Sequence, residues 1–259
     1  MNHPTSLRTQ SDQEDTPGII FSRELGGVAG YAVGVLHMAS PFAFVPGNIQ
    51  NATTMPFPVA YECVQSVTLQ EVLSGHPKVE EGLVIAAQRL EGRGVRAIVG
   101  ACGSFANCQQ ALTSAVSVPV FASVLVQVPW LLHCMSARRR LGIVFADRKS
   151  FTHKLQEQCG IRDLDRLAIT DCIELPPFRA LLDRPYAIAH EALMESVTAH
   201  VRSFARLYPD LGAVMLQCSE LAPYASAIQA AVGVPVIDVN TLVAWAHSIS
   251  VRVPYTGHL

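Results

Sequence analysis

The chain has 259 residues, of which 50% are hydrophobic and 15% are charged, and its formal net charge is −2. This composition predicts a well-filled core and excludes a disordered chain, and the near-neutral charge argues against nucleic acid as a partner. The longest apolar run, residues 116–132, is interrupted by prolines and is shorter than a bilayer-spanning helix, so we expect no membrane partner.

The N-terminal residues and the cysteines indicate the cellular compartment of the protein. Residues 1–18 are polar and lack the apolar stretch of a secretory signal, and residues 1–28 are expected to form a polar N-terminal tail. The seven cysteines are odd in number and irregular in spacing, which argues against a disulfide framework. We therefore expect a cytoplasmic protein with reduced thiols.

Apolar runs and helical spacing divide the chain into alternating strands and helices. In the first half they predict strands at 31–38, 59–67, 97–102 and 118–123, helices at 76–92 and 103–117, and a proline-rich loop at 40–58. In the second half they predict strands at 141–146, 167–172, 213–218 and 234–239, and helices at 149–158, at 187–207 and after residue 218. This alternation is typical of an α/β protein with parallel sheets.

One pattern occurs twice and carries a cysteine each time. The two copies are Gly100-Ala101-Cys102-Gly103-Ser104 and Leu216-Gln217-Cys218-Ser219-Glu220, and each is followed in the same register by Val-Pro-Val. Each cysteine follows a strand and precedes a helix, whose N-terminus is expected to lower the thiol pKa. Two thiols on opposite sides of a carbon could remove a proton from one face and return it to the other. The duplication also predicts two similar lobes.

These motifs resemble the two cysteine motifs of the aspartate/glutamate racemase superfamily, which acts without pyridoxal phosphate, and the resemblance extends over most of the chain from about residue 30. It implies two pseudo-symmetric Rossmann-like lobes with an interlobe cleft, no cofactor, and Cys102 and Cys218 as catalytic base and acid. The expected lobes are residues 29–124 with 237–259, and residues 125–236. The expected substrate-binding residues are Ser40, Gly103, Ser104, Ser219 and Glu220.

Other site types find little support in the sequence. No Cys-x-x-Cys or His-Glu-x-x-His motif is present, so we expect no metal. The remaining cysteines have no counterpart in the repeat and are expected to be structural; they are Cys63, Cys108, Cys134, Cys159 and Cys172.

The sequence favours a cofactor-independent racemase or epimerase of a small carboxylate or amide, amino-acid-like or hydantoin-like. Two alternatives stay open: a decarboxylase or cis–trans isomerase using one thiol, and a non-catalytic two-lobed binding protein. The loop 38–58 has no charged residue, and Gly103-Ser104 stands where amino-acid racemases commonly carry Asn-Thr. We therefore expect a neutral or ring-shaped substrate in preference to glutamate or aspartate. A homo-oligomer is left open.

Overall fold

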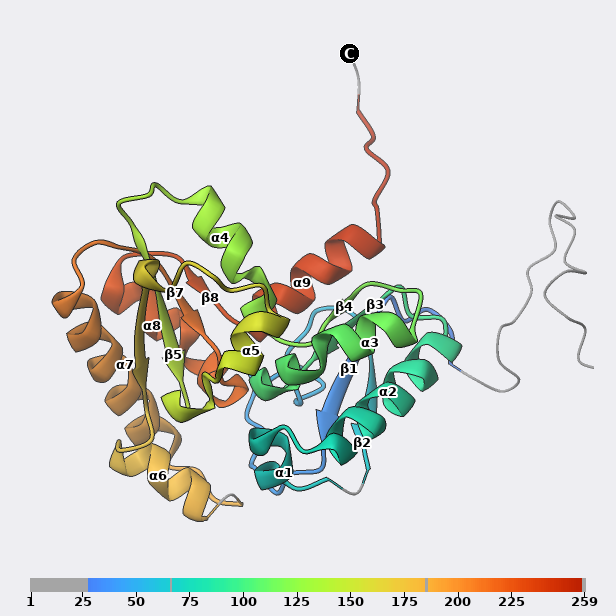
Figure 1. The fold of residues 1–259 in the computed structure, drawn as a ribbon, viewed down its shortest axis with the longest axis horizontal. Helices are drawn as coiled ribbons and strands as arrows, with labels where there is room; N and C mark the ends of the chain where they lie inside the picture. Colours follow the sequence, from blue (N-terminus) through green and yellow to red (C-terminus); the bar gives the residue numbers. More distant parts are fainter. Residues whose placement is uncertain (1–27, 66, 185, 258–259) are drawn as a thin grey trace, which may run out of the picture.

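The computed structural model describes residues 28–65, 67–184 and 186–257, so the predicted N-terminal tail, except Val28, lies outside the described residues. Within these ranges the chain forms two four-stranded sheets, each entirely parallel, with strand orders β2-β1-β3-β4 and β6-β5-β7-β8. The two orders are equivalent, and the sheets lie in two lobes side by side (Figure 1). The predicted α/β class with parallel sheets and two lobes is confirmed.

The first sheet and its helices come from one continuous stretch of chain. Its strands are β1 (Val33–Met38), β2 (Val59–Val64), β3 (Ala97–Gly100) and β4 (Val120–Phe121). Its helical segments are α1 (Leu69–Ser74), α2 (Pro77–Gly92), the 3-10 helix η2 (Gly103–Cys108) and α3 (Gln109–Ala115).

The second sheet repeats this plan. The chain reaches it through η3 (Val124–Gln127) and α4 (Val128–Cys134). Its strands are β5 (Arg140–Phe145), β6 (Leu167–Asp171), β7 (Leu211–Leu216) and β8 (Val236–Ile237). Its helical segments are η4 (Arg148–Ser150), α5 (His153–Gln158), η5 (Leu164–Arg166), α6 (Pro176–Asp183), α7 (His190–Leu207), η6 (Ser219–Tyr224) and α8 (Ala225–Val232).

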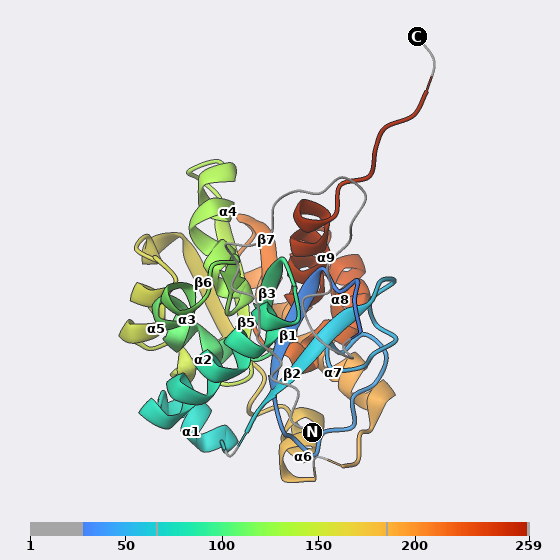
Figure 2. The same cartoon turned by 90° about the vertical axis from the view of Figure 1, so that its right-hand side faces the viewer.

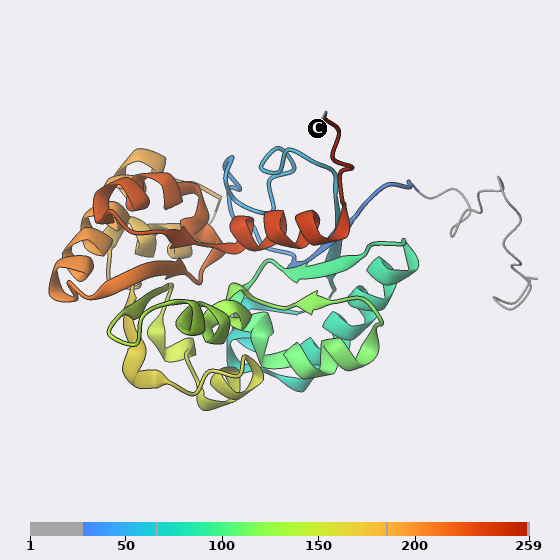
Figure 3. The ribbon, with the colours of Figure 1, turned by 90° about the horizontal axis from the view of Figure 1, so that it is seen from above.

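A last helix, α9 (Val239–Ser250), returns to the first lobe. It contacts β1 and β3, and Figures 2 and 3 show it beside the strands of the first sheet. The sequence did not predict this helix, because the apolar run at 234–239 was taken as one strand. In the structure β8 ends at Ile237, and Asp238 caps α9 by accepting a hydrogen bond from the Thr241 amide.

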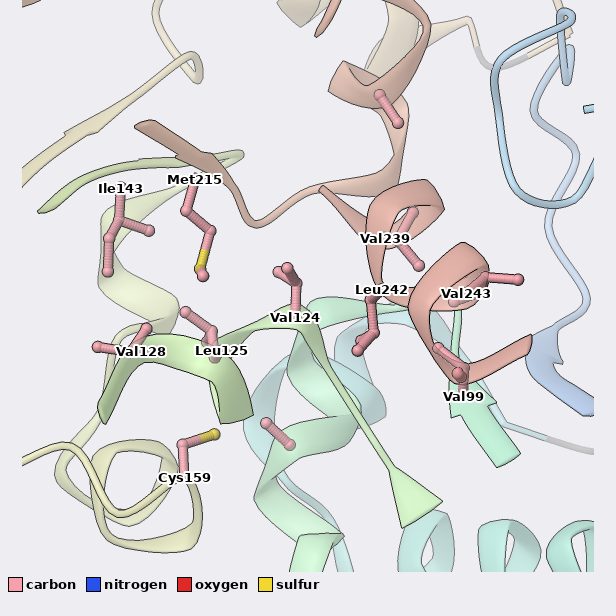
Figure 4. Close-up of a cluster of buried hydrophobic side chains, with 14 of the residues drawn as sticks. Val99, Val124, Leu125, Val128, Ile143, Cys159, Met215, Val239, Leu242 and Val243 are labelled. Carbon is pink, nitrogen blue, oxygen red and sulfur yellow. The ribbon is translucent and has the colours of Figure 1, made fainter. Parts of the chain in front are cut away.

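Burial on both faces explains why the strands could be recognised as apolar runs. Leu36 packs outward against the helices of the first lobe, whereas its neighbours Val33 and Val35 point into a core that both sheets share. Figure 4 shows part of this shared core, with Val99 from the first lobe, Ile143 and Met215 from the second, Val124 and Leu125 between them, and α9 side chains next to Val99. The two sheets are therefore joined by a common apolar core. Within the described ranges, no helix has both the length and the hydropathy needed to cross a membrane.

Two further helices escaped prediction, and both matter for the site. Helix α1 has six residues and buries only Val72, so it gives no periodic apolar signal; its boundaries come from the Thr68 capping box and the left-handed Gly75. Helix α6 begins with two prolines and also lies at the end of the molecule where α1 is found (Figures 1 and 2).

Candidate active site

A pocket of about 330 Å³ lies between the two lobes and receives side chains from both. Its size is at the lower end of the range typical of small-molecule sites. All seven site residues expected from the sequence line it: Ser40, Cys102, Gly103, Ser104, Cys218, Ser219 and Glu220. The other lining residues are Met38, Phe42, Gln50, Leu69, Leu73, Ala146, Asp147, Lys149, Ser150, Ile173, Phe178, Leu182 and Gln217.

The two repeat cysteines reach the pocket by equivalent routes. Cys102 follows β3 and is the residue before η2, and Cys218 follows β7 and is the residue before η6. Because ligands of open parallel sheets bind at the carboxyl ends of the strands, duplication places one thiol from each lobe at the same site. Both side chains are partly buried and both thiols are free.

The two motifs also touch each other. A β-carbon built on Gly103 would overlap the side-chain amide of Gln217 and would lie 2.7 Å from the Gln217 carbonyl oxygen. Only glycine has room at this position. The departure from the Asn of amino-acid racemases is thus explained by the close approach of the second motif.

The thiol pKa values differ from the sequence expectation. Burial raises the pKa of Cys102; the amides of Ser104 and Phe105 and the Ser104 hydroxyl oppose this rise, and Glu220 adds to it. Burial likewise raises the pKa of Cys218 well above its ordinary value; Glu220 adds to the rise, and only the Glu220 amide among the described donors lowers it. The amides at the helix starts act in the predicted direction, but desolvation outweighs them, so the expected lowering of the two thiol pKa values is wrong.

Glu220 is the acidic side chain whose charge acts on both thiols. Burial raises its pKa to about 7, and a hydrogen bond from Asn48 partly opposes the rise. Asn48 Nδ2 donates to Glu220 Oε1 at 3.1 Å and to the Ser219 carbonyl at 3.5 Å. Near neutral pH this carboxyl therefore exchanges readily between its charged and neutral forms.

The sequence analysis missed Asn48, which belongs to the proline-rich loop at 40–58, here called the first-lobe loop. The loop is anchored at two points: Gly47, with φ +97°, lies against Pro223 of the second lobe, and Asn240 Nδ2 of α9 donates to the Gly47 carbonyl at 2.6 Å. Asn48 itself is only 1% exposed. The one local signal was the Pro-Gly-Asn turn at 46–48, which gives no indication of a partner more than half the chain away.

The pocket is also lined by two charged residues from η4 and its N-cap. Asp147 caps this short helix by accepting from the Lys149 amide at 2.9 Å. Among the described residues that line the pocket, Lys149 is the one cationic side chain, and it takes part in no ion pair within the described ranges. The first-strand loop has no cation, as expected, but the second lobe provides one.

The apolar loop divides its side chains between pocket and core. Met38, Ser40, Phe42 and Gln50 line the pocket. Phe57, in contrast, packs on the shared core and stacks on His247 with ring centroids 3.7 Å apart. The loop thus contributes part of the pocket wall, and its remainder supports the lobe.

The five other cysteines lie outside the pocket lining. Cys108, Cys159 and Cys172 are buried, as expected of structural residues, and Cys63 is half-buried. Cys134 is exposed and fills no core position. No group of three or more His, Cys, Asp or Glu side chains in the described part of the chain is arranged to hold a metal ion.

Comparison with known proteins links the chain to a group of lyases. No family model matches it. It is 28% identical over 244 residues to dimethylsulfoniopropionate lyase 5 of Emiliania huxleyi (strain CCMP1516), a match covering 90% of this chain and 48% of that protein. Lyase 3 of the same organism is 27% identical over 218 residues, covering 80% and 56%. The chain spans about half the length of these curated relatives.

Solved structures share its fold at low sequence identity. Allantoin racemase from Klebsiella pneumoniae has a TM-score of 0.57 at 18% identity, covering 85% of this chain and 87% of that one. Unliganded arylmalonate decarboxylase has a TM-score of 0.53 at 15% identity, covering 85% and 92%. A glutamate racemase from Bacillus anthracis has a TM-score of 0.50 at 16% identity, covering 86% and 84%. The chain has the two-lobed fold of the aspartate/glutamate racemase superfamily, as the resemblance of its cysteine motifs implied.

Proposed function

We propose that the chain is a cofactor-independent lyase that cleaves a sulfonium carboxylate such as dimethylsulfoniopropionate into an unsaturated carboxylate and a neutral sulfide. The observation that carries this proposal is the gathering of two thiols and the Glu220 carboxyl group in a single pocket, which equips the site to remove a proton from carbon. The curated relatives, all named as dimethylsulfoniopropionate lyases, favour elimination as the step that follows.

The reaction balances without a further reagent. A thiolate takes the proton from the carbon next to the carboxylate, and the electron pair of that C–H bond becomes the new carbon–carbon double bond. The bond between the β-carbon and sulfur breaks, and its electron pair leaves with the sulfur as a neutral dialkyl sulfide. The thiol then returns its proton to water, so the net products are acrylate, dialkyl sulfide and a proton.

Cys102 is the better candidate for the base. Three groups oppose the rise of its pKa, the amides of Ser104 and Phe105 and the Ser104 hydroxyl, whereas one group, the Glu220 amide, opposes the rise at Cys218. Polar hydrogens near a thiolate favour its charged form, and the pKa of Cys102 is raised while that of Cys218 is raised well above its ordinary value, so Cys102 ionises more readily. Cys218 then remains a thiol, able to donate a hydrogen bond in the pocket.

Lys149 is the natural partner for the substrate carboxylate. As the proton leaves, negative charge moves from carbon onto the carboxylate oxygens, and a cation placed there stabilises this charge more strongly than that of the ground state. The ammonium group of Lys149 is the cation available among the described lining residues.

Racemisation is the second candidate, and the duplicated motif is the observation that favours it. A racemase needs one thiol for each face of the carbon, and the pocket receives one from each lobe. Elimination needs only one base. The two activities therefore predict different responses to removal of the thiols.

The test compares Cys102→Ser and Cys218→Ser, with Cys63→Ser as the matched control at a cysteine outside the pocket. Dimethyl sulfide released from dimethylsulfoniopropionate is measured by gas chromatography, and chirality is followed in a panel of amino acids and hydantoins. For a lyase we expect Cys102→Ser to lose about 10²–10⁴-fold in sulfide release, Cys218→Ser to lose less, and the control to be unaffected. Racemisation without sulfide release, abolished equally by both substitutions, would replace the lyase assignment with the racemase one.

A further inference from the structure

We propose that Glu220, held by Asn48, binds the onium centre of the substrate and selects a fully alkylated cation over a primary ammonium. The inference rests on the proposed lyase function and specifies how its substrate is recognised. It assigns the two charges of a zwitterion to two parts of the pocket, the carboxylate to Lys149 and the onium to Glu220.

The first argument is the balance of charge around the thiols. Cys102, Cys218 and Glu220 each become anionic on losing a proton, and Glu220 raises the pKa of both thiols. Within the described ranges Glu220 takes part in no ion pair, and its side chain has a single hydrogen-bond donor, the neutral amide of Asn48. A cation brought in by the substrate would favour the charged form of all three groups, including the thiolate that starts the reaction.

The second argument is the character of the wall. The surface that the pocket exposes is mostly apolar, with Phe42, Phe178 and Met38 among its members. A primary ammonium presents three N–H donors that need acceptors, and unpaired donors are costly in such surroundings. A sulfonium or quaternary ammonium has none, and its alkyl groups suit apolar and aromatic side chains.

The other acid of the pocket is less suited to this role. The Asp147 carboxylate already accepts the Lys149 amide as the cap of η4, and it lies two residues from the cation that we assign to the substrate carboxylate. An onium centre at Asp147 would leave no separate place for the two charges of the substrate. Asp147 is therefore the matched control for Glu220.

Binding can be measured without turnover by calorimetry in the Cys102→Ser background. Three probes of similar length are compared: 3-(trimethylammonio)propanoate, its isostere 4,4-dimethylpentanoate, which keeps the carboxylate but lacks the onium charge, and the primary ammonium β-alanine. We expect the quaternary probe to bind about tenfold or more tightly than either of the others. Adding Glu220→Gln should abolish its advantage over the isostere without the onium charge, Asn48→Ala should reduce it, and Asp147→Asn should preserve it.

The outcomes separate the subsite from the lyase activity. A preference for the quaternary probe that disappears with Glu220→Gln supports the subsite, even if the wild-type protein releases no sulfide. An unchanged preference in Glu220→Gln overturns the subsite, even if sulfide is released. β-Alanine binding as tightly as the quaternary probe also overturns the proposed selection. Circular dichroism of each variant checks that the fold is retained.

Discussion

Substitution of Gly103 by alanine should separate the two cysteine motifs. The added methyl group would overlap the Gln217 side chain, which could rotate away, and would lie 2.7 Å from the Gln217 carbonyl oxygen, which could move only with its backbone. Forcing a methyl group into a packed site typically costs about 1–3 kcal/mol. No left-handed φ is required at Gly103, so alanine also gains about 0.4–1 kcal/mol through the lower entropy of the unfolded chain. The steric cost outweighs this gain.

The expected net destabilisation of Gly103→Ala is about 1–2 kcal/mol. For a chain of this size that corresponds to a decrease in Tm of about 2–8 °C. Catalysis should suffer more than stability, because a shift of about 1 Å between positioned groups can cost about 10²-fold in rate. Thermal unfolding and sulfide release measure the two effects separately.

Gly92→Ala is the control for the change of residue type. Gly92 lies in α2 with no atom within 4 Å of the added carbon, so alanine there should raise the free energy of unfolding by about 0.5–1 kcal/mol. The double variant Gly103→Ala/Gln217→Ala removes the side-chain overlap but keeps the carbonyl contact, and should recover only part of the lost stability. A Gly103→Ala protein with wild-type Tm and activity would refute the claim that the two motifs are in close contact.

Two further predictions concern the charged groups of the pocket. Lys149→Met should raise KM for a sulfonium carboxylate about tenfold or more. The control Arg148→Met removes an ion pair between the exposed Arg148 side chain and Asp171 and should leave KM unchanged. Steady-state kinetics of both variants test this prediction. The pKa of Glu220 is raised from its usual 4.5 to about 7, so the unfolded chain releases this proton at lower pH than the folded one. The free energy of unfolding should therefore fall as pH rises from about 4.5 to about 7. Glu220→Gln should make the urea unfolding midpoint less dependent on pH in that range. The same pH dependence of the urea midpoint in both proteins would contradict the raised pKa of Glu220.

The sequence revealed the sheets and the thiols because both depend on local patterns. Strands buried on both faces, such as β5, appear as uninterrupted apolar runs, and their duplication identifies equivalent ends. The carboxyl ends of parallel strands lie at one edge of a sheet, and the duplication puts each cysteine at the equivalent edge of its own sheet. The positions of the motifs in the sequence were therefore enough to predict that Cys102 and Cys218 share a site. Short helices such as α1 bury too few side chains to leave a periodic signal.

The remaining parts of the site depend on contacts between distant segments. Asn48 meets Glu220 only because the first-lobe loop docks on the second lobe, and a single sequence gives no sign of this pairing. Lys149 could be recognised as a cation but not as part of the pocket. The thiol pKa values show the same division: the amide donors follow from the local motif, whereas the desolvation that outweighs them is a property of the packed protein.

A common first step explains how one fold accommodates both racemases and a proposed lyase. Once a thiolate has removed the proton beside a carboxylate, the resulting carbanion either regains a proton or expels a group from the next carbon. A second thiol that keeps its proton, as the raised pKa of Cys218 favours, provides the first outcome. A substrate with a positively charged sulfur provides the second, because departure of a neutral sulfide removes the charge of the carbanion within the same molecule. On this reasoning the outcome depends on whether the pocket admits an onium group. The surroundings of Glu220 therefore determine the class of reaction, and the number of thiols does not.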